Sequence, residues 1–140
     1  MNKLMTTMMM ASLISTSVVS HELTFSMKAV KKNQGKIYVA LFKGEESYQN
    51  RNAHSSVIVD ADNDIINVTF SHLPKGEYAI RYFHDLNDNG KLDVNLFGSP
   101  LEGIGFSNNA KPSYGPVGYD GAKFMLSKDL VNESTVIYGE

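Results

Sequence analysis

The chain has 140 residues, a formal net charge of −2 and no cysteine. This length favours one domain, and without cysteine the domain cannot be held together by disulfide bonds. The near balance of 13 basic and 15 acidic residues lacks the basic excess typical of a nucleic-acid-binding surface, so we expect no nucleic-acid partner.

The N-terminal residues are typical of a secretory signal peptide. A short basic start ends at Lys3, residues 4–19 are uncharged and largely apolar or small, and residues 17–20 offer a small-residue cleavage site. We expect cleavage after Ser20, which would leave residues 21–140 as a periplasmic or secreted domain. A buried or membrane-spanning helix is a weaker alternative, because the run is short and interrupted by hydroxyl side chains. No other segment is apolar and long enough to span a bilayer.

The mature chain begins with two segments of alternating polarity. Residues 23–29 and 36–42 each place apolar side chains at every second position, which predicts strands with one buried face. The turn-forming residues 33–35 separate them. This pattern predicts a β-hairpin.

The central segments predict more short strands. Residues 43–55 are polar and predict a loop or a short helical crossover. Residues 56–59 and 65–70 predict strands on either side of the acidic segment 60–64. For that segment a solvated hairpin turn is favoured over a cation site, because Asp and Asn commonly form turns.

The second half of the chain is less regular. Residues 78–83 predict a strand, which Pro74 and Gly76 introduce through a turn. Residues 94–119 are rich in glycine, proline and aromatic residues, which predicts one long ordered loop. Closing strands are expected at 122–126 and 135–138. About seven short antiparallel strands predict an all-β fold, a single β-sandwich.

The most informative pattern follows the strand of residues 78–83. Oxygen-bearing side chains and a glycine have the spacing of the first nine positions of an EF-hand loop. They are Asp85, Asn87, Asn89, Gly90 and Asp93. Position 12 of that loop should be a bidentate Glu, whereas here it is Leu96, and the segment before the loop predicts a strand instead of a helix. The spacing therefore favours a calcium-type loop on a β scaffold.

Three interpretations of this loop stay open. In the first, a non-enzymatic binding module uses calcium to order the loop, and the aromatic residues beyond it contact a protein or glycan partner. The predicted ligands are Asp85, Asn87, Asn89, the Lys91 carbonyl, Asp93 and Glu102. In the second, the same side chains only stabilise turns. In the third, a small hydrolase acts on glycans through His84, Asp85 and Glu102, although no nucleophile motif or zinc-ligand spacing supports an enzyme.

A longer motif resembles a known family. It runs from His84-Asp85-x-Asn87-x-Asn89-Gly90-Lys91-Leu92-Asp93 to Asn95-x-x-Gly98-x-Pro100-x-Glu102-Gly103-x-Gly105-Phe106-Ser107-Asn108-Asn109. This motif resembles secreted bacterial proteins of the domain of unknown function 2141, and the resemblance covers nearly the whole mature chain. Residues 117–119 depart from the family pattern. The resemblance implies a secreted prealbumin-like or immunoglobulin-like sandwich and no established activity.

Overall fold

The computed structural model describes residues 11–15 and 18–139 of the chain. Most of the predicted signal peptide lies outside these residues, so its removal after Ser20 stays a prediction. In the described part of the chain, no helix is long and apolar enough to span a membrane.

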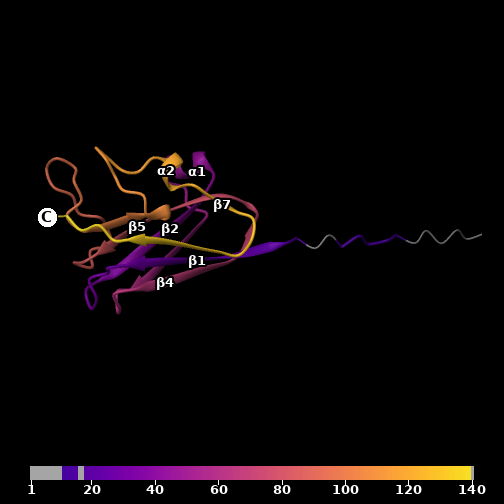
Figure 1. Cartoon of the computed structure of the whole chain (residues 1–140), viewed down its shortest axis with the longest axis horizontal. Helices are drawn as coiled ribbons and strands as arrows, with labels where there is room; N and C mark the ends of the chain where they lie inside the picture. The colour runs from indigo at the N-terminus through magenta and orange to yellow at the C-terminus, as the bar shows by residue number, and fades with distance from the viewer. Residues whose placement is uncertain (1–10, 16–17, 140) are drawn as a thin grey trace, which may run out of the picture.

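The strands form two facing sheets, as expected for a β-sandwich (Figure 1). The first sheet has the order β4-β1-β8, with β1 at Ser20–Lys28, β4 at Ile66–Pro74 and β8 at Leu130–Thr135. The second has the order β3-β2-β5-β6, with β2 at Lys36–Lys43, β3 at Ser55–Asp60, β5 at Gly76–Asp85 and β6 at Gly103–Phe106. The short strand β7, at Phe124–Leu126, pairs with the first residues of β5. The predicted all-β class is confirmed, although β1 and β8 run parallel instead of antiparallel.

Both predicted hairpins are wrong. Strand β1 pairs with β4 and β8, whereas β2 pairs with β3 and β5, so the turn at residues 33–35 carries the chain from one sheet to the other. The acidic segment between β3 and β4 also joins different sheets. A turn between two segments of alternating polarity indicates only that two strands follow each other along the chain. It does not decide whether they pair in one sheet or face each other across the core.

Two other predictions fail in the C-terminal half. The last strand is β8, at Leu130–Thr135, instead of residues 135–138, and the predicted long loop contains the strand β6. Strand β6 escapes sequence analysis because its two glycines remove the alternating pattern. A Cβ on Gly105 would lie 2.1 Å from the Tyr82 ring, and a Cβ on Gly103 would lie 2.5 Å from the Tyr138 ring. These contacts require glycine inside the strand.

The main core lies between the two sheets. The apolar side chains of β1 pack against those of β2 and β5. Each large apolar side chain that is fully buried stabilises the fold by roughly 1.5–3 kcal/mol. This core includes Leu23, Phe25, Met27, Val39, Leu41 and Ile80. A smaller cluster lies on the opposite face of the second sheet, under α1 (Glu45–Gln49) and α2 (Tyr119–Ala122). Figure 1 shows the two helices together at one end of β2 and β5.

Candidate functional site

The loop begins where β5 ends, at a buried carboxylate. Asp85 has no exposed surface, and the loop wraps around its side chain. Its Oδ1 accepts the backbone N–H of Asn89 at 3.2 Å, and its Oδ2 accepts that of Gly90 at 2.7 Å. Gly90 has a φ of +78°, a conformation that glycine adopts without strain. The carboxylate therefore fixes the sharp turn that the spacing predicted.

The two asparagines converge on the second carboxylate of the loop. The side-chain amide of Asn87 donates to Asp93 Oδ2 at 2.6 Å, and that of Asn89 donates to both carboxylate oxygens at 2.9 Å. These hydrogen bonds, those from Asn89 foremost, lower the pKa of Asp93 because they stabilise its charged form. Asn89 Oδ1 also accepts the backbone N–H of Lys91 at 3.2 Å. Asn87 and Asn89 thus contact Asp93 through their amide nitrogens.

Glu102 joins the two ends of the loop. It is only 5% exposed and lies just before β6. Its Oε1 accepts the backbone N–H of Leu86 at 2.9 Å and that of Asn87 at 3.4 Å, and its Oε2 accepts that of Asp93 at 3.1 Å. The chain therefore doubles back after the loop and brings this carboxylate beside it.

One contact to the loop was missed by sequence analysis. Gly35 has a φ of +60°, and a Cβ built on it would lie 1.8 Å from the backbone carbonyl oxygen of Asp85. The turn at residues 33–35 therefore packs directly against the first residue of the loop and needs glycine there. The sequence marked this glycine as a turn former, but nothing in it pointed to Asp85.

The oxygens of this network are compatible with a hard cation. Calcium prefers carboxylate, amide and carbonyl oxygens, and these are the groups gathered here. Both oxygens of Asp85 and Oε2 of Glu102 each accept one backbone N–H and keep a second lone pair, whereas Oε1 of Glu102 accepts two. Among the described residues, no basic side chain forms an ion pair with Asp85, Asp93 or Glu102, and no three His, Cys, Asp or Glu side chains are arranged as a metal site. The described geometry is that of a hydrogen-bonded turn network.

The acid/base set of the hydrolase interpretation is not accessible. His84 is fully buried; its Nδ1 lies 2.7 Å from the Tyr138 hydroxyl, and its Nε2 bonds to the carbonyl of Gln34. Because that carbonyl can only accept, Nε2 carries the proton. The Tyr138 hydroxyl, which lies at Nδ1, also accepts the backbone N–H of Lys31 at 2.8 Å. His84 is therefore a buried core residue with both ring nitrogens engaged in hydrogen bonds.

An exposed apolar tip extends from the loop. Asn95 Oδ1 accepts the backbone N–H groups of Phe97 and Ser99 at 2.9 and 3.0 Å, which folds residues 95–99 into a tight turn. The tip side chains point into solvent, and Leu96 is 102% and Phe97 92% exposed. The backbone N–H of Leu101 donates to the carbonyl of Asp93 at 2.9 Å and ties the base of this tip to the loop.

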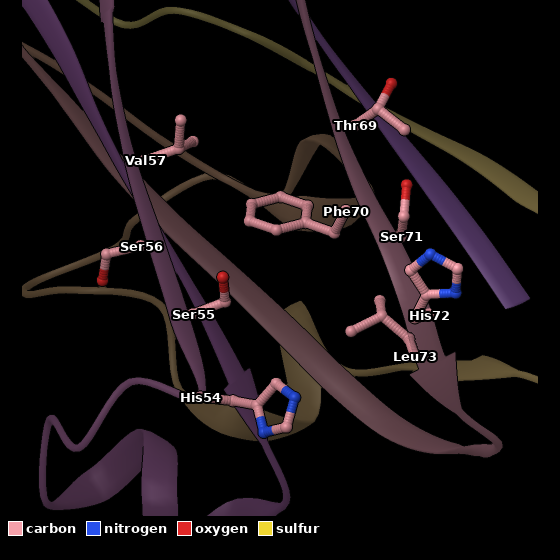
Figure 2. Close-up of a pocket in the computed structure, with 9 residues that line it drawn as sticks. All are labelled: His54, Ser55, Ser56, Val57, Thr69, Phe70, Ser71, His72 and Leu73. Atoms are coloured by element: carbon pink, nitrogen blue, oxygen red, sulfur yellow. The ribbon is translucent and has the colours of Figure 1, made fainter. Parts of the chain in front are cut away.

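A groove lies at the opposite edge of the sandwich, between β3 and β4 (Figure 2). It has a volume of about 390 Å³ and is open and mostly polar. Its lining consists of His54, Ser55, Ser56, Val57, Thr69, Phe70, Ser71, His72 and Leu73. Small-molecule sites are usually concave and mostly apolar, so this groove is a poor match for one. It also lies apart from His84, which does not line it.

Comparison with known proteins supports the resemblance seen in the motif. Residues 26–134 match the family described as "Uncharacterized protein conserved in bacteria (DUF2141)". The matched region begins within β1 and ends within β8, so it covers both sheets and the loop. No curated protein and no solved structure matches the chain.

Proposed function

The chain belongs to the bacterial family DUF2141, and we propose that it is a non-enzymatic extracytoplasmic module. In this proposal, calcium orders the loop that starts at Asp85, and the ordered loop holds the apolar tip in place for a protein or glycan partner. The observation that carries the proposal is the pair of buried carboxylates, Asp85 and Glu102, which have no basic partner among the described residues.

Buried charge is the first argument for a cation. A carboxylate removed from water is destabilised unless it is paired, hydrogen-bonded or bound to a metal. Backbone N–H groups compensate Asp85 and Glu102 in part, and Asp93 adds a third negative charge to the same loop. A divalent cation would bring these carboxylates a positive charge, which neutral amide groups cannot supply.

The asparagine side chains offer a second argument. The amide groups of Asn87 and Asn89 point their nitrogens at Asp93, and a half-turn of each amide would point their oxygens there instead. That change requires a cation between the oxygens. The ligands would be Asp85, Asn87, Asn89, the Lys91 carbonyl, Asp93 and Glu102, and calcium would supply the positive charge that holds them together.

The tip provides the binding surface. Leu96 and Phe97 lie exposed at the end of a short turn whose base is hydrogen-bonded to Asp93. Exposed apolar side chains that gather at one place are typical of interaction sites. Ordering of the loop would therefore fix the position of the tip.

Thermal unfolding of residues 21–140 tests the cation. The midpoint should be measured in chelator and then in millimolar calcium or magnesium, because a ligand that binds only the folded state raises stability as its concentration passes Kd. We expect calcium to raise the midpoint of the wild type and not that of Asp85→Ala. The matched control is Asp88→Asn, which removes an exposed charge from the same loop and should keep the response. If calcium has no effect on the wild type, the loop is a purely structural turn.

The proposed location has its own test. The full chain, expressed in a bacterium with a periplasm, should yield a processed protein whose N-terminal residue is His21. A cytoplasmic protein that retains Met1 would refute the extracytoplasmic assignment without affecting the cation experiment.

A further inference from the structure

Both arginines of the chain contact Tyr48, which belongs to the cluster on the outer face of the second sheet. The sequence contains eleven lysines but only Arg51 and Arg81 as arginines. Arg81 is on β5, opposite Ala40 of β2 and Phe106 of β6. Arg51 follows α1, and its backbone N–H donates to the carbonyl of Tyr48 at 3.3 Å. Arg51 thus contacts Tyr48 through its backbone, and Arg81 contacts it through its guanidinium.

Aromatic rings fix the position of the Arg81 guanidinium. Its Cζ lies 5.2 Å from the centre of the Tyr48 ring and 5.8 Å from that of Phe106. Both rings are almost fully buried, and the Tyr48 hydroxyl donates to the carbonyl of Val117 at 2.6 Å. Cation–π contacts of this kind hold a guanidinium while leaving its N–H groups free. The Arg81 guanidinium is therefore positioned by two buried aromatic rings, Tyr48 and Phe106.

Among the residues that the structure describes, no acidic side chain forms an ion pair with the Arg81 guanidinium. The ion pairs found among the described residues are Lys28–Glu133 and Lys123–Asp120. In the same part of the chain, the Arg81 side chain forms no hydrogen bond. Burial lowers the pKa of Arg81, Tyr48 raises it in part, and the charge of Arg51 lowers it again. No carboxylate is among the groups that act on it. A half-buried cation next to a second cation would gain from an anion that both could bind.

We propose that Arg81 and Arg51 form a binding site for an oxyanion, such as the carboxylate of an acidic sugar or a phosphate group. The planar fork of a guanidinium matches both groups with two parallel hydrogen bonds, which the ammonium of lysine cannot reproduce. The site uses Arg81 as the fixed donor and the exposed Arg51 as the second positive charge. It is independent of the calcium loop and does not require a bound cation.

NMR of the arginine side chains tests this site directly. With two arginines the Nε–Hε region contains two signals, and Arg51→Lys assigns them. Residues 21–140 should be titrated with sodium phosphate and, separately, with sodium glucuronate, while sodium chloride keeps the ionic strength constant. We expect a saturable shift of the Arg81 signal. Saturation with glucuronate alone would identify a carboxylate ligand, and saturation with phosphate alone a phosphate ligand.

Variants separate a specific site from general attraction of anions. Arg81→Lys keeps the charge but removes the fork, and backbone signals near Tyr48 should then report binding weakened by at least about tenfold. Lys128→Gln removes one exposed positive charge elsewhere and should leave the affinity unchanged. If neither anion gives a saturable shift, or if Arg81→Lys binds as tightly as the wild type, the proposal is wrong. Backbone spectra of each variant show whether it is folded.

Discussion

Glu102 holds the end of the loop at Asp93, because its Oε2 accepts the backbone N–H of Asp93 at 3.1 Å. The other oxygen of the same carboxylate accepts the N–H of Leu86, at the start of the loop. One side chain thus joins two backbone segments that are seven residues apart along the chain. Glu102 is also buried, so water could not take the place of its oxygens as hydrogen-bond acceptors if the side chain were changed.

The first prediction concerns Glu102→Gln. An amide in place of the carboxylate keeps the shape but offers one acceptor oxygen where two are needed, and it points N–H groups at N–H groups. We expect the free energy of unfolding to fall by roughly 1–3 kcal/mol, the cost of buried hydrogen-bonding groups left without partners. Urea unfolding in chelator measures this cost. Asp88→Asn should change it little, and a neutral result for Glu102→Gln would mean that the carboxylate does not hold the loop.

The second prediction concerns the close approach of β6 to β5. A Cβ on Gly105 would lie 2.1 Å from the ring and hydroxyl of Tyr82, which is buried in the core. Gly105→Ala should therefore destabilise the protein by roughly 3 kcal/mol, at the upper end of the cost of overpacking. Gly118→Ala is the matched control, since nothing lies within 4 Å of the added methyl group and its φ is −69°. Equal unfolding midpoints for the two variants would contradict the described packing.

The third prediction concerns alkaline pH. Burial raises the pKa of Tyr82 far above its ordinary value of 10.0, partly opposed by the hydrogen bond with Ser134. The folded state thus keeps a proton that the unfolded state loses above pH 10. Stability from this group is complete below pH 10 and falls as pH rises further, by about 1.4 kcal/mol per pH unit. Urea unfolding between pH 9 and 11 measures how the free energy of unfolding changes with pH.

Tyr82→Phe provides the comparison for this slope. It should be less stable at neutral pH, because the buried Ser134 hydroxyl loses its partner at 2.8 Å. Its stability should nevertheless decline less steeply above pH 10. Parallel curves for the two proteins would mean that Tyr82 does not contribute to alkaline unfolding.

The fourth prediction concerns acid. Hydrogen bonds from Asn89 and Asn87 lower the pKa of Asp93 below its ordinary value of 3.8. The folded state then releases this proton more readily than the unfolded state. The resulting stability is present above pH 3.8 and is lost as pH falls through the lower folded pKa. Acid titration in chelator should show a smaller loss in Asp93→Asn, and carboxylate NMR should show Asp93 titrating below 3.8.

The sequence by itself determined the inward face of the first strands and the outline of the loop. Alternation of polarity identified Leu23, Phe25 and Met27 as buried, because a side chain's face in a strand depends only on its position. The spacing of the loop likewise predicted a sharp turn at Gly90, and the hydrogen bond that holds this turn joins it to Asp85, five residues earlier. Such short-range relationships are visible in one chain segment.

Only the tertiary structure decided which strands pair and which side chains meet. The local pattern around residues 33–35 is the same for a hairpin and for a crossing between sheets, and the choice depends on β4, β5 and β8, which follow later in the chain. Strand β6 was hidden because the rings of Tyr82 and Tyr138 require glycine in it. The contact of Arg81 with the Tyr48 ring likewise depends on how α1 packs on the sheet, and no spacing along the sequence encodes that contact.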